Sequence, residues 1–261
     1  MNYTSINRTV AAETKTGSGS IVNYGKKMAD TDTALIKLSQ EIMYAARLGE
    51  QTDSLLKVIA ALDEANLQNA LDTDEKKMAF WINMYNGFTQ VLLKADSNLY
   101  KKRGAFFRKK AINVGGHFYS LDDIEHDILR RSAVKWSGGY FNDIFPGKKE
   151  KAERVKRKDY RIHFALNCGA KSCPPIAFYE PENLNRQLNL AERAYLSAEV
   201  VYDSTTNKLY LPAIMGWFRK DFDGKKGMIK IIKRRGIIGE DVNPAIHFKP
   251  YDWTLYLNHY Q

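Results

Sequence analysis

Cys168 and Cys173 are the only cysteines among the 261 residues of the chain, and they lie five positions apart. Residues 160–168 alternate apolar and other side chains, which predicts a β-strand that leads into the first cysteine. Gly169 and the pair Pro174-Pro175 then force a turn. A thiol at the end of a strand, beside a turn, is well placed to act as a nucleophile if a base lies nearby.

The two thiols admit other interpretations. Free cysteines are often buried as small apolar side chains, and two of them also suffice for a single disulfide. A spacing of five without two further ligands nearby does not predict a zinc site. We therefore expect no cofactor and no metal, with a site built from Cys168, Cys173 and His126 as the alternative.

The best candidate for a base lies in residues 120–131, which are predicted to form a helix. Ser120 and Asp123 have the spacing of a capping box at its start. The face predicted to be buried consists of Leu121, Ile124, Ile128 and Leu129. Glu125 falls inside this face and His126 at its edge, so Glu125 needs a dedicated partner. We expect His126 to activate a cysteine and Glu125 to orient or tune it.

Other polar groups are candidates for the walls of such a site. Residues 74–94 are predicted to form an almost wholly buried helix, with Asn83 and Asn86 on its uncharged polar stripe. These amides either line a cavity or bind neighbouring backbone. With Asp221 they are also rival partners for the imidazole, and the backbone N–H groups at Gly169 and the next residue are candidate donors to an oxyanion.

The order of predicted elements indicates an α+β fold. We expect N-terminal helices packed on a mostly antiparallel sheet with intervening helices. Residues 1–25 are predicted to form a flexible leader, residues 26–70 the N-terminal helices, and residues 71–261 an α+β core that is one compact domain with 26–70. On the predicted strand 160–168, His163 faces away from the apolar side chains and is expected to be structural or to face solvent.

Composition narrows the classes of function. The net charge is +10 and 44% of residues are hydrophobic, so the chain can bury a sizeable core. Its basic stretches, 148–158 and 225–235, have the composition of solvated helix faces, and no nucleic-acid motif accompanies them. No apolar run is long enough for a transmembrane span. We expect no nucleic-acid partner, whereas the sequence leaves the oligomeric state open.

Four segments together resemble the domain-of-unknown-function 547 family (DUF547). They are 80–86 (FWINMYN), 123–130 (DIEHDILR), 163–175 (HFALNCGAKSCPP) and 211–222 (LPAIMGWFRKDF), and the closing Tyr251-Asp-Trp253 also fits. The resemblance covers about residues 72–256. It places the Glu-His pair of the family on Glu125 and His126 and its Cys-Gly on Cys168-Gly169. Some plant members carry Ser at the position of Cys173, which favours Cys168 as the functional thiol.

The resemblance also implies a family of bacterial and plant proteins, often exported, with a suggested papain-like or transglutaminase-like relationship. Because the histidine precedes the cysteine here, such a relationship implies a permuted papain-like arrangement. An exported protein, periplasmic or in the cell envelope, with its signal segment absent from this chain, is the implied location, and the cytoplasm is the alternative.

These observations lead to two predictions of function. The first is a cysteine-dependent hydrolase or acyl-transferase that acts on an amide bond of a small peptide or peptidoglycan-like substrate. Cys168 is its nucleophile, His126 its base and Glu125 the group that tunes them, with Asn83, Asn86, Gly169, Cys173 and Asp221 around the substrate. The second is a non-catalytic binding or scaffold module, in which Glu125, His126 and the amides form a buried polar network.

Overall fold

The computed structural model describes residues 32–261, so the expected leader, residues 1–25, lies outside the described residues. The main helices are α2 (Asp32–Leu48), α3 (Asp53–Ala60), α4 (Glu64–Ala70), α5 (Asp74–Ala95), α6 (Arg103–Arg108), α7 (Lys148–Glu153), α8 (Leu184–Glu199), α9 (Ala213–Trp217) and α10 (Gly224–Arg234). Short 3₁₀ helices are η1 (Ser97–Lys102), η3 (Lys135–Ser137), η4 (Tyr160–Phe164) and η5 (Pro181–Asn183), and η2 (Asp123–Leu129) is a π-helix. The strands are β1 (Ile112–Val114), β2 (His117–Tyr119), β3 (Val201–Asp203), β4 (Lys208–Leu211) and β5 (Ala245–Phe248).

Helix α5 is the centre of the larger hydrophobic cluster. All residues from 77 to 90 are buried, because both its apolar side chains and its uncharged amides are enclosed by other elements. Helix α2 packs closely along it at Gly87, where a Cβ would lie 3.1 Å from Cγ of Met43. Of the N-terminal helices, α2 therefore packs on α5, whereas α3 packs on the β1–β2 hairpin, where Gly115 N donates to Ile59 O (3.0 Å).

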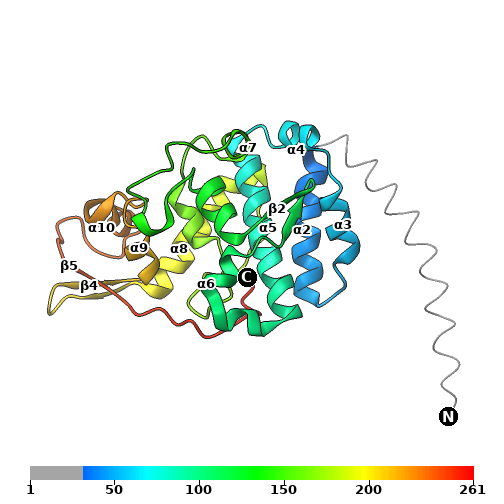
Figure 1. Ribbon diagram of the computed structural model, residues 1–261. Coiled ribbons are helices and arrows are strands. Elements are labelled where there is room, and N and C mark those ends of the chain that lie inside the picture. The colour runs from blue at the N-terminus through cyan, green and yellow to red at the C-terminus, as the bar shows by residue number, and fades with distance from the viewer. Residues whose placement is uncertain (1–31) are drawn as a thin grey trace, which may run out of the picture.

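The sheets are small, and the first of them packs against α5, where the rings of Trp81 and Tyr119 lie 5.0 Å apart between centroids. Strands β1 and β2 form an antiparallel hairpin that turns at Gly115 and Gly116. In the second sheet β3 pairs with β4 in antiparallel orientation, and β4 pairs with β5 in parallel orientation. Figure 1 shows α2 and α3 at one end of the molecule and α10, β4 and β5 at the other. The fold is α+β, as the sequence predicts.

A second hydrophobic cluster forms at the other end, from α8, β4, α9 and α10. The segment 160–168 joins the two clusters, since Ile162 belongs to the first and Phe164 to the second. This segment is the 3₁₀ helix η4 followed by a loop, so the prediction of a strand is wrong. Its apolar side chains alternate with other residues because they are buried against two different clusters. None of the helices in residues 32–261 is both long and apolar enough to cross a membrane.

The helix predicted at residues 120–131 is present but unusual. Its capping box forms as expected, because Ser120 N donates to Asp123 Oδ2 (2.8 Å) and Asp123 N donates to Ser120 Oγ (3.0 Å). The turns after Asp123 are π-helical, and Arg130 N donates five residues back to the carbonyl oxygen of Glu125 (2.9 Å). Short π-helical turns are rare and often occur at functional sites.

Candidate functional site

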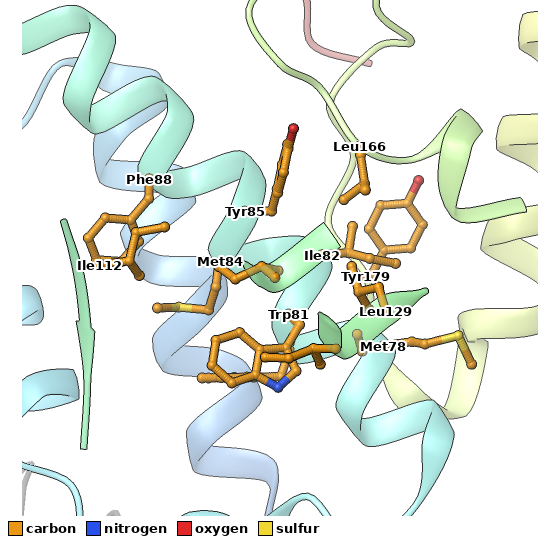
Figure 2. Packing of buried hydrophobic residues seen from close by; sticks show 14 of the residues in the cluster. Met78, Trp81, Ile82, Met84, Tyr85, Phe88, Ile112, Leu129, Leu166 and Tyr179 are labelled. Carbon is orange, nitrogen blue, oxygen red and sulfur yellow. The ribbon is translucent and has the colours of Figure 1, made fainter. Parts of the chain in front are cut away.

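A cavity of about 240 Å³ lies where the two hydrophobic clusters meet. Tyr85 and Leu166 reach it from the first cluster, and Ile214 and Phe218 from the second. Its ionisable lining comes from the π-helix and the residue before it, η3, η4, the cysteine turn and the segment after β5, and consists of Asp122, Glu125, His126, Lys135, His163, Cys168 and Tyr251. Figure 2 shows the hydroxyl of Tyr85 at the end of a side chain that projects from α5, level with Leu166.

Two asparagines fix the turn that carries the cysteines. Asn86, from α5, donates to the carbonyl oxygen of Ala165 (2.9 Å) and accepts from Asn167 N (2.8 Å). Asn167 in turn accepts from Gly169 N (2.9 Å) and donates to the carbonyl oxygen of Pro174 (2.8 Å). Gly169 has a φ of +88°, which favours glycine, and a Cβ there would lie 2.9 Å from Leu93 Cδ1. The turn is therefore rigidly defined by buried amides.

The C-terminal segment completes the site from a distant part of the sequence. Residues 252–256 run beside the cysteine turn, where Lys171 N donates to Thr254 O (2.8 Å) and Tyr256 N donates to Gly169 O (2.8 Å). This pairing places the hydroxyl of Tyr251 3.2 Å from Sγ of Cys173 and 3.6 Å from Sγ of Cys168. Figure 1 shows the chain returning from β5 towards α6 to reach this position.

The two thiols lie 3.0 Å apart, Sγ to Sγ, and differ in environment. Cys168 is half-buried and lines the cavity, whereas Cys173 is 3% exposed and does not. The hydrogen bond from Cys173 lowers the pKa of Cys168, and Tyr251 and the Ala170 amide act in the same direction. Burial raises the pKa of Cys173. Cys168 is therefore the thiol that ionises first, with the Cys173 and Tyr251 protons directed at it.

His126 is held as a neutral imidazole by its neighbour on the π-helix. Arg130 Nη1 lies 2.9 Å from His126 Nδ1, and since a guanidinium only donates, Nδ1 accepts and the ring proton is on Nε2. Burial, together with the charge of Arg130, lowers the pKa of His126 to about 2. The free side of His126 is thus an N–H donor, and the nearest carboxylate oxygen, Asp122 Oδ1, is 3.8 Å from it.

His163 has the opposite arrangement. Its Nε2 lies 2.9 Å from Oδ2 of Asp221, and the same oxygen accepts from Arg130 Nε (2.6 Å). The His163 and Arg130 donors hold the pKa of Asp221 well below its usual range despite its burial, so the carboxylate is ionised. His163 donates from Nε2, which leaves Nδ1 as an acceptor, and its ring stacks on Phe218 at 4.0 Å between centroids. Burial lowers the pKa of His163, which favours the neutral ring.

Glu125 lies on the cavity wall with a protonation state poised near neutral pH. Burial raises its pKa to about 7, and Tyr85 donates to its Oε2 (3.3 Å). Tyr85 is thus the partner that the sequence predicts Glu125 to need. Nearby, Asp122 is paired with Lys135 at 2.7 and 2.8 Å. The cavity therefore combines an acidic thiol, an N–H donor, a ring acceptor and a carboxyl group that can hold a proton.

The other predicted site residues lie behind the lining. Asn83 donates to Ser39 Oγ (3.1 Å) and to Tyr179 O (3.0 Å), and with Asn86 it is absent from the cavity wall, so both amides bind backbone instead. The N–H of Gly169 is occupied by Asn167 and is not free for an oxyanion. Asp221 is also absent from the cavity wall and accepts a hydrogen bond from Nε2 of His163, which lines it. Cys168, His126 and His163 all line the cavity. Within residues 32–261, however, no hydrogen bond joins Sγ of Cys168 to either imidazole ring.

Sequence reasoning missed His163, Arg130 and Tyr251. A strand over this segment would turn His163 away from the apolar side chains, whereas the 3₁₀ helix η4 brings it into the cavity wall; His163 also opens one of the motifs quoted above. Tyr251 stands in the closing Tyr-Asp-Trp motif, but only the fold shows that it meets the thiols. Within residues 32–261 no group of three or more His, Cys, Asp or Glu side chains is arranged to hold a metal ion.

Comparison with known proteins agrees with the motifs. No curated protein and no solved structure matches the chain. One family model matches part of the chain, and three of the four segments quoted above lie within the matched residues. The segment 211–222 and Tyr251 lie outside the matched residues, but both contribute side chains to the same cavity. Residues 69–196 match the family model described as "Protein of unknown function, DUF547".

Proposed function

We propose that the cavity is the active site of a cysteine-dependent hydrolase or acyl-transferase acting on an amide bond. The observation that carries the proposal is the Cys168 thiol, whose pKa is lowered and which lines a cavity shared with His126, His163 and Glu125. Thiol nucleophiles need a lowered pKa, access to substrate and a group that transfers protons. The proposal rests on this pocket, since no comparison supports a papain-like or transglutaminase-like relationship.

Cys168 is the nucleophile in this proposal. Its sulfur attacks the carbonyl carbon, a C–S bond forms, and the carbonyl electron pair moves to oxygen. When the tetrahedral intermediate collapses, the C–N bond breaks and leaves a thioester on Cys168. Water then releases the acid in a hydrolase, or an amine or hydroxyl takes the acyl group in a transferase. Cys173 supports the thiolate as a donor and is too buried to attack.

His163 fits the role of proton carrier better than His126. Nδ1 of His126 is engaged by Arg130, so this ring has no acceptor left for a thiol proton. His163 has its Nε2 fixed by Asp221 and its Nδ1 uncommitted, the arrangement that orients a general base. His163 takes the thiol proton on attack and returns it to the leaving nitrogen. Contacts of this kind are often long before substrate binds.

The remaining lining suits an amide carbonyl and an apolar side group. The Nε2–H of His126 is a neutral donor able to stabilise the oxyanion, and Glu125 can donate a proton near neutral pH. Trp217 and Trp253 stack at 5.5 Å between centroids at one side of the cavity and provide an aromatic wall. A small peptide or peptidoglycan-like amide with an apolar group is the substrate class that this wall favours. An exported location also stays a proposal, carried over from the family resemblance.

Alkylation by iodoacetamide tests the proposal. At about pH 6 we expect Cys168 to be carboxamidomethylated faster than free cysteine, because only the thiolate reacts. Peptide mapping assigns the modified residue, and Cys173→Ser is the control, because it removes the second thiol and keeps a hydrogen-bond donor to Cys168. Reaction of Cys168 no faster than free cysteine refutes the nucleophile assignment.

A non-catalytic binding module is the second candidate. It is favoured by the buried chain of hydrogen bonds His126–Arg130–Asp221–His163, which can serve the fold without any substrate. In that case Cys168→Ser lowers the free energy of unfolding and leaves ligand binding intact. If instead the variant folds normally and loses thiol reactivity together with activity on an amide substrate, the binding module is excluded.

A further inference from the structure

One segment outside the cavity exposes large apolar side chains to an unusual degree. Trp136, Ile144 and Phe145 are 82%, 78% and 84% exposed, and Tyr140 and Phe141 between them are also exposed. Single exposed apolar residues need no explanation, but five within ten positions do. We call residues 136–145 the aromatic loop.

The aromatic loop is held in place by backbone hydrogen bonds at both ends and in its middle. Val134 N donates to Phe141 O (2.9 Å), and Asp143 N donates to Ser132 O (2.7 Å). Lys220 N, from the turn after α9, donates to Gly138 O (3.0 Å). The loop is therefore a defined projection that presents its side chains outwards.

Basic residues adjoin this projection, two by direct contact and two in the sequence. Lys158 donates to Asn142 Oδ1 (2.9 Å), Lys220 adjoins Gly138, and Arg131 and Lys148 flank the loop in sequence. None of these four cations forms an ion pair with an acidic side chain in the described part of the chain. Residues 131–158 contain nine Lys and Arg against three Asp and Glu, and thus carry +6 of the net +10.

We propose that the aromatic loop docks on an anionic lipid bilayer. Tryptophan and tyrosine prefer the headgroup region, whereas isoleucine and phenylalanine enter the edge of the hydrocarbon. The surrounding lysines and arginines complement anionic headgroups. Single-stranded nucleic acid would also meet cations and aromatic rings. The bilayer is favoured because Ile144, an aliphatic side chain with no use in base stacking, is among the most exposed of the large apolar side chains in the described residues.

Co-sedimentation of the full chain with lipid vesicles tests the proposal. We expect binding to phosphatidylcholine vesicles that contain about one third phosphatidylglycerol, and much weaker binding to pure phosphatidylcholine. The variant Trp136→Ser/Phe145→Ser should lower the partition coefficient at least about tenfold, since both side chains lose burial. Lys148→Gln should lower it roughly fivefold. The matched control is Leu190→Ser, which removes a side chain 56% exposed on α8 and should change nothing.

Each other outcome overturns the proposal. Binding that is absent, equal on both vesicle types, or unaffected by the loop variant excludes lipid docking. Binding of single-stranded DNA without binding of vesicles identifies a nucleic-acid surface instead. Self-association that the loop variant abolishes, again without vesicle binding, identifies a contact between two copies of the chain. Circular dichroism of each variant confirms that these exposed substitutions leave the fold intact.

Discussion

Replacement of Asp221 by Asn tests the polar network that orients the two histidines. The carboxylate accepts from both Arg130 Nε and His163 Nε2, and the three side chains are 3%, 1% and 2% exposed. The substitution keeps the shape of the side chain and removes its charge. Arg130 is then left as a buried cation without a counter-ion.

The expected loss of stability follows from this burial. Removal of one partner from a buried ion pair lowers the free energy of unfolding by about 3–5 kcal/mol, and the Asn carbonyl still accepts one hydrogen bond, so we expect about 3 kcal/mol. A domain is typically stable by only about 5–15 kcal/mol, so the effect is large. Equilibrium unfolding in urea at neutral pH measures it. The control is Glu199→Gln, which removes a half-exposed pair with Lys249 and should cost less than about 1 kcal/mol.

A second substitution distinguishes the charge from the shape. Arg130→Met added to Asp221→Asn removes the unpaired cation, so the double variant should be more stable than Asp221→Asn alone. The reasoning is refuted if Asp221→Asn is no more destabilising than Glu199→Gln, or if the two substitutions are simply additive.

Three further predictions concern the cavity and its surroundings. Burial raises the folded-state pKa of Glu125 from 4.5 to about 7, so the folded state binds the extra proton and stability falls as pH rises between these values. Glu125→Gln should reduce this fall by roughly 3 kcal/mol in urea unfolding at about pH 4.5 and about pH 8, and the part due to Asp127, whose pKa burial also raises to about 7, should remain; an unchanged pH dependence contradicts the burial argument. Gly139 has a φ of +90°, and a Cβ there would collide with the Asp221 carboxylate, so Gly139→Ala should destabilise far more than Gly116→Ala, where φ is +78° and nothing lies within 4 Å. Equal thermal shifts in the two variants exclude a close approach at Gly139. Tyr251→Phe removes a donor to Cys168 and should slow its alkylation at about pH 6 severalfold, whereas an unchanged rate excludes Tyr251 from stabilising the thiolate.

Local patterns predicted local structure well. The buried helix at 74–94, the capping box of Ser120 and Asp123, and the turn at Gly115-Gly116 all follow from short-range rules, and the structure confirms them. The alternation of apolar side chains predicted the wrong element where a segment is buried against two different clusters. The apolar side chains of residues 160–168 contact both hydrophobic clusters, Ile162 and Leu166 the first and Phe164 the second. A 3₁₀ helix followed by a loop buries these side chains on two sides without forming a strand.

The candidate site was only partly predictable for a related reason. Cys168, Glu125 and His126 could be named from residue types and spacing, and all three line the cavity. The roles of the two histidines depend on which ring nitrogen is occupied, and Arg130 and Asp221 determine this from positions 91 residues apart. No local pattern encodes such a contact.

Capture of an acyl group on the thiol tests the central claim most directly. The protein is incubated with 4-nitrophenyl acetate, and its mass and modified peptide are determined. We expect one acetyl group on Cys168, absent in Cys168→Ala, retained in Cys173→Ala, and formed roughly a hundredfold more slowly in His163→Asn. An unmodified Cys168, or acetylation confined to lysines, contradicts the proposal that this thiol is a nucleophile.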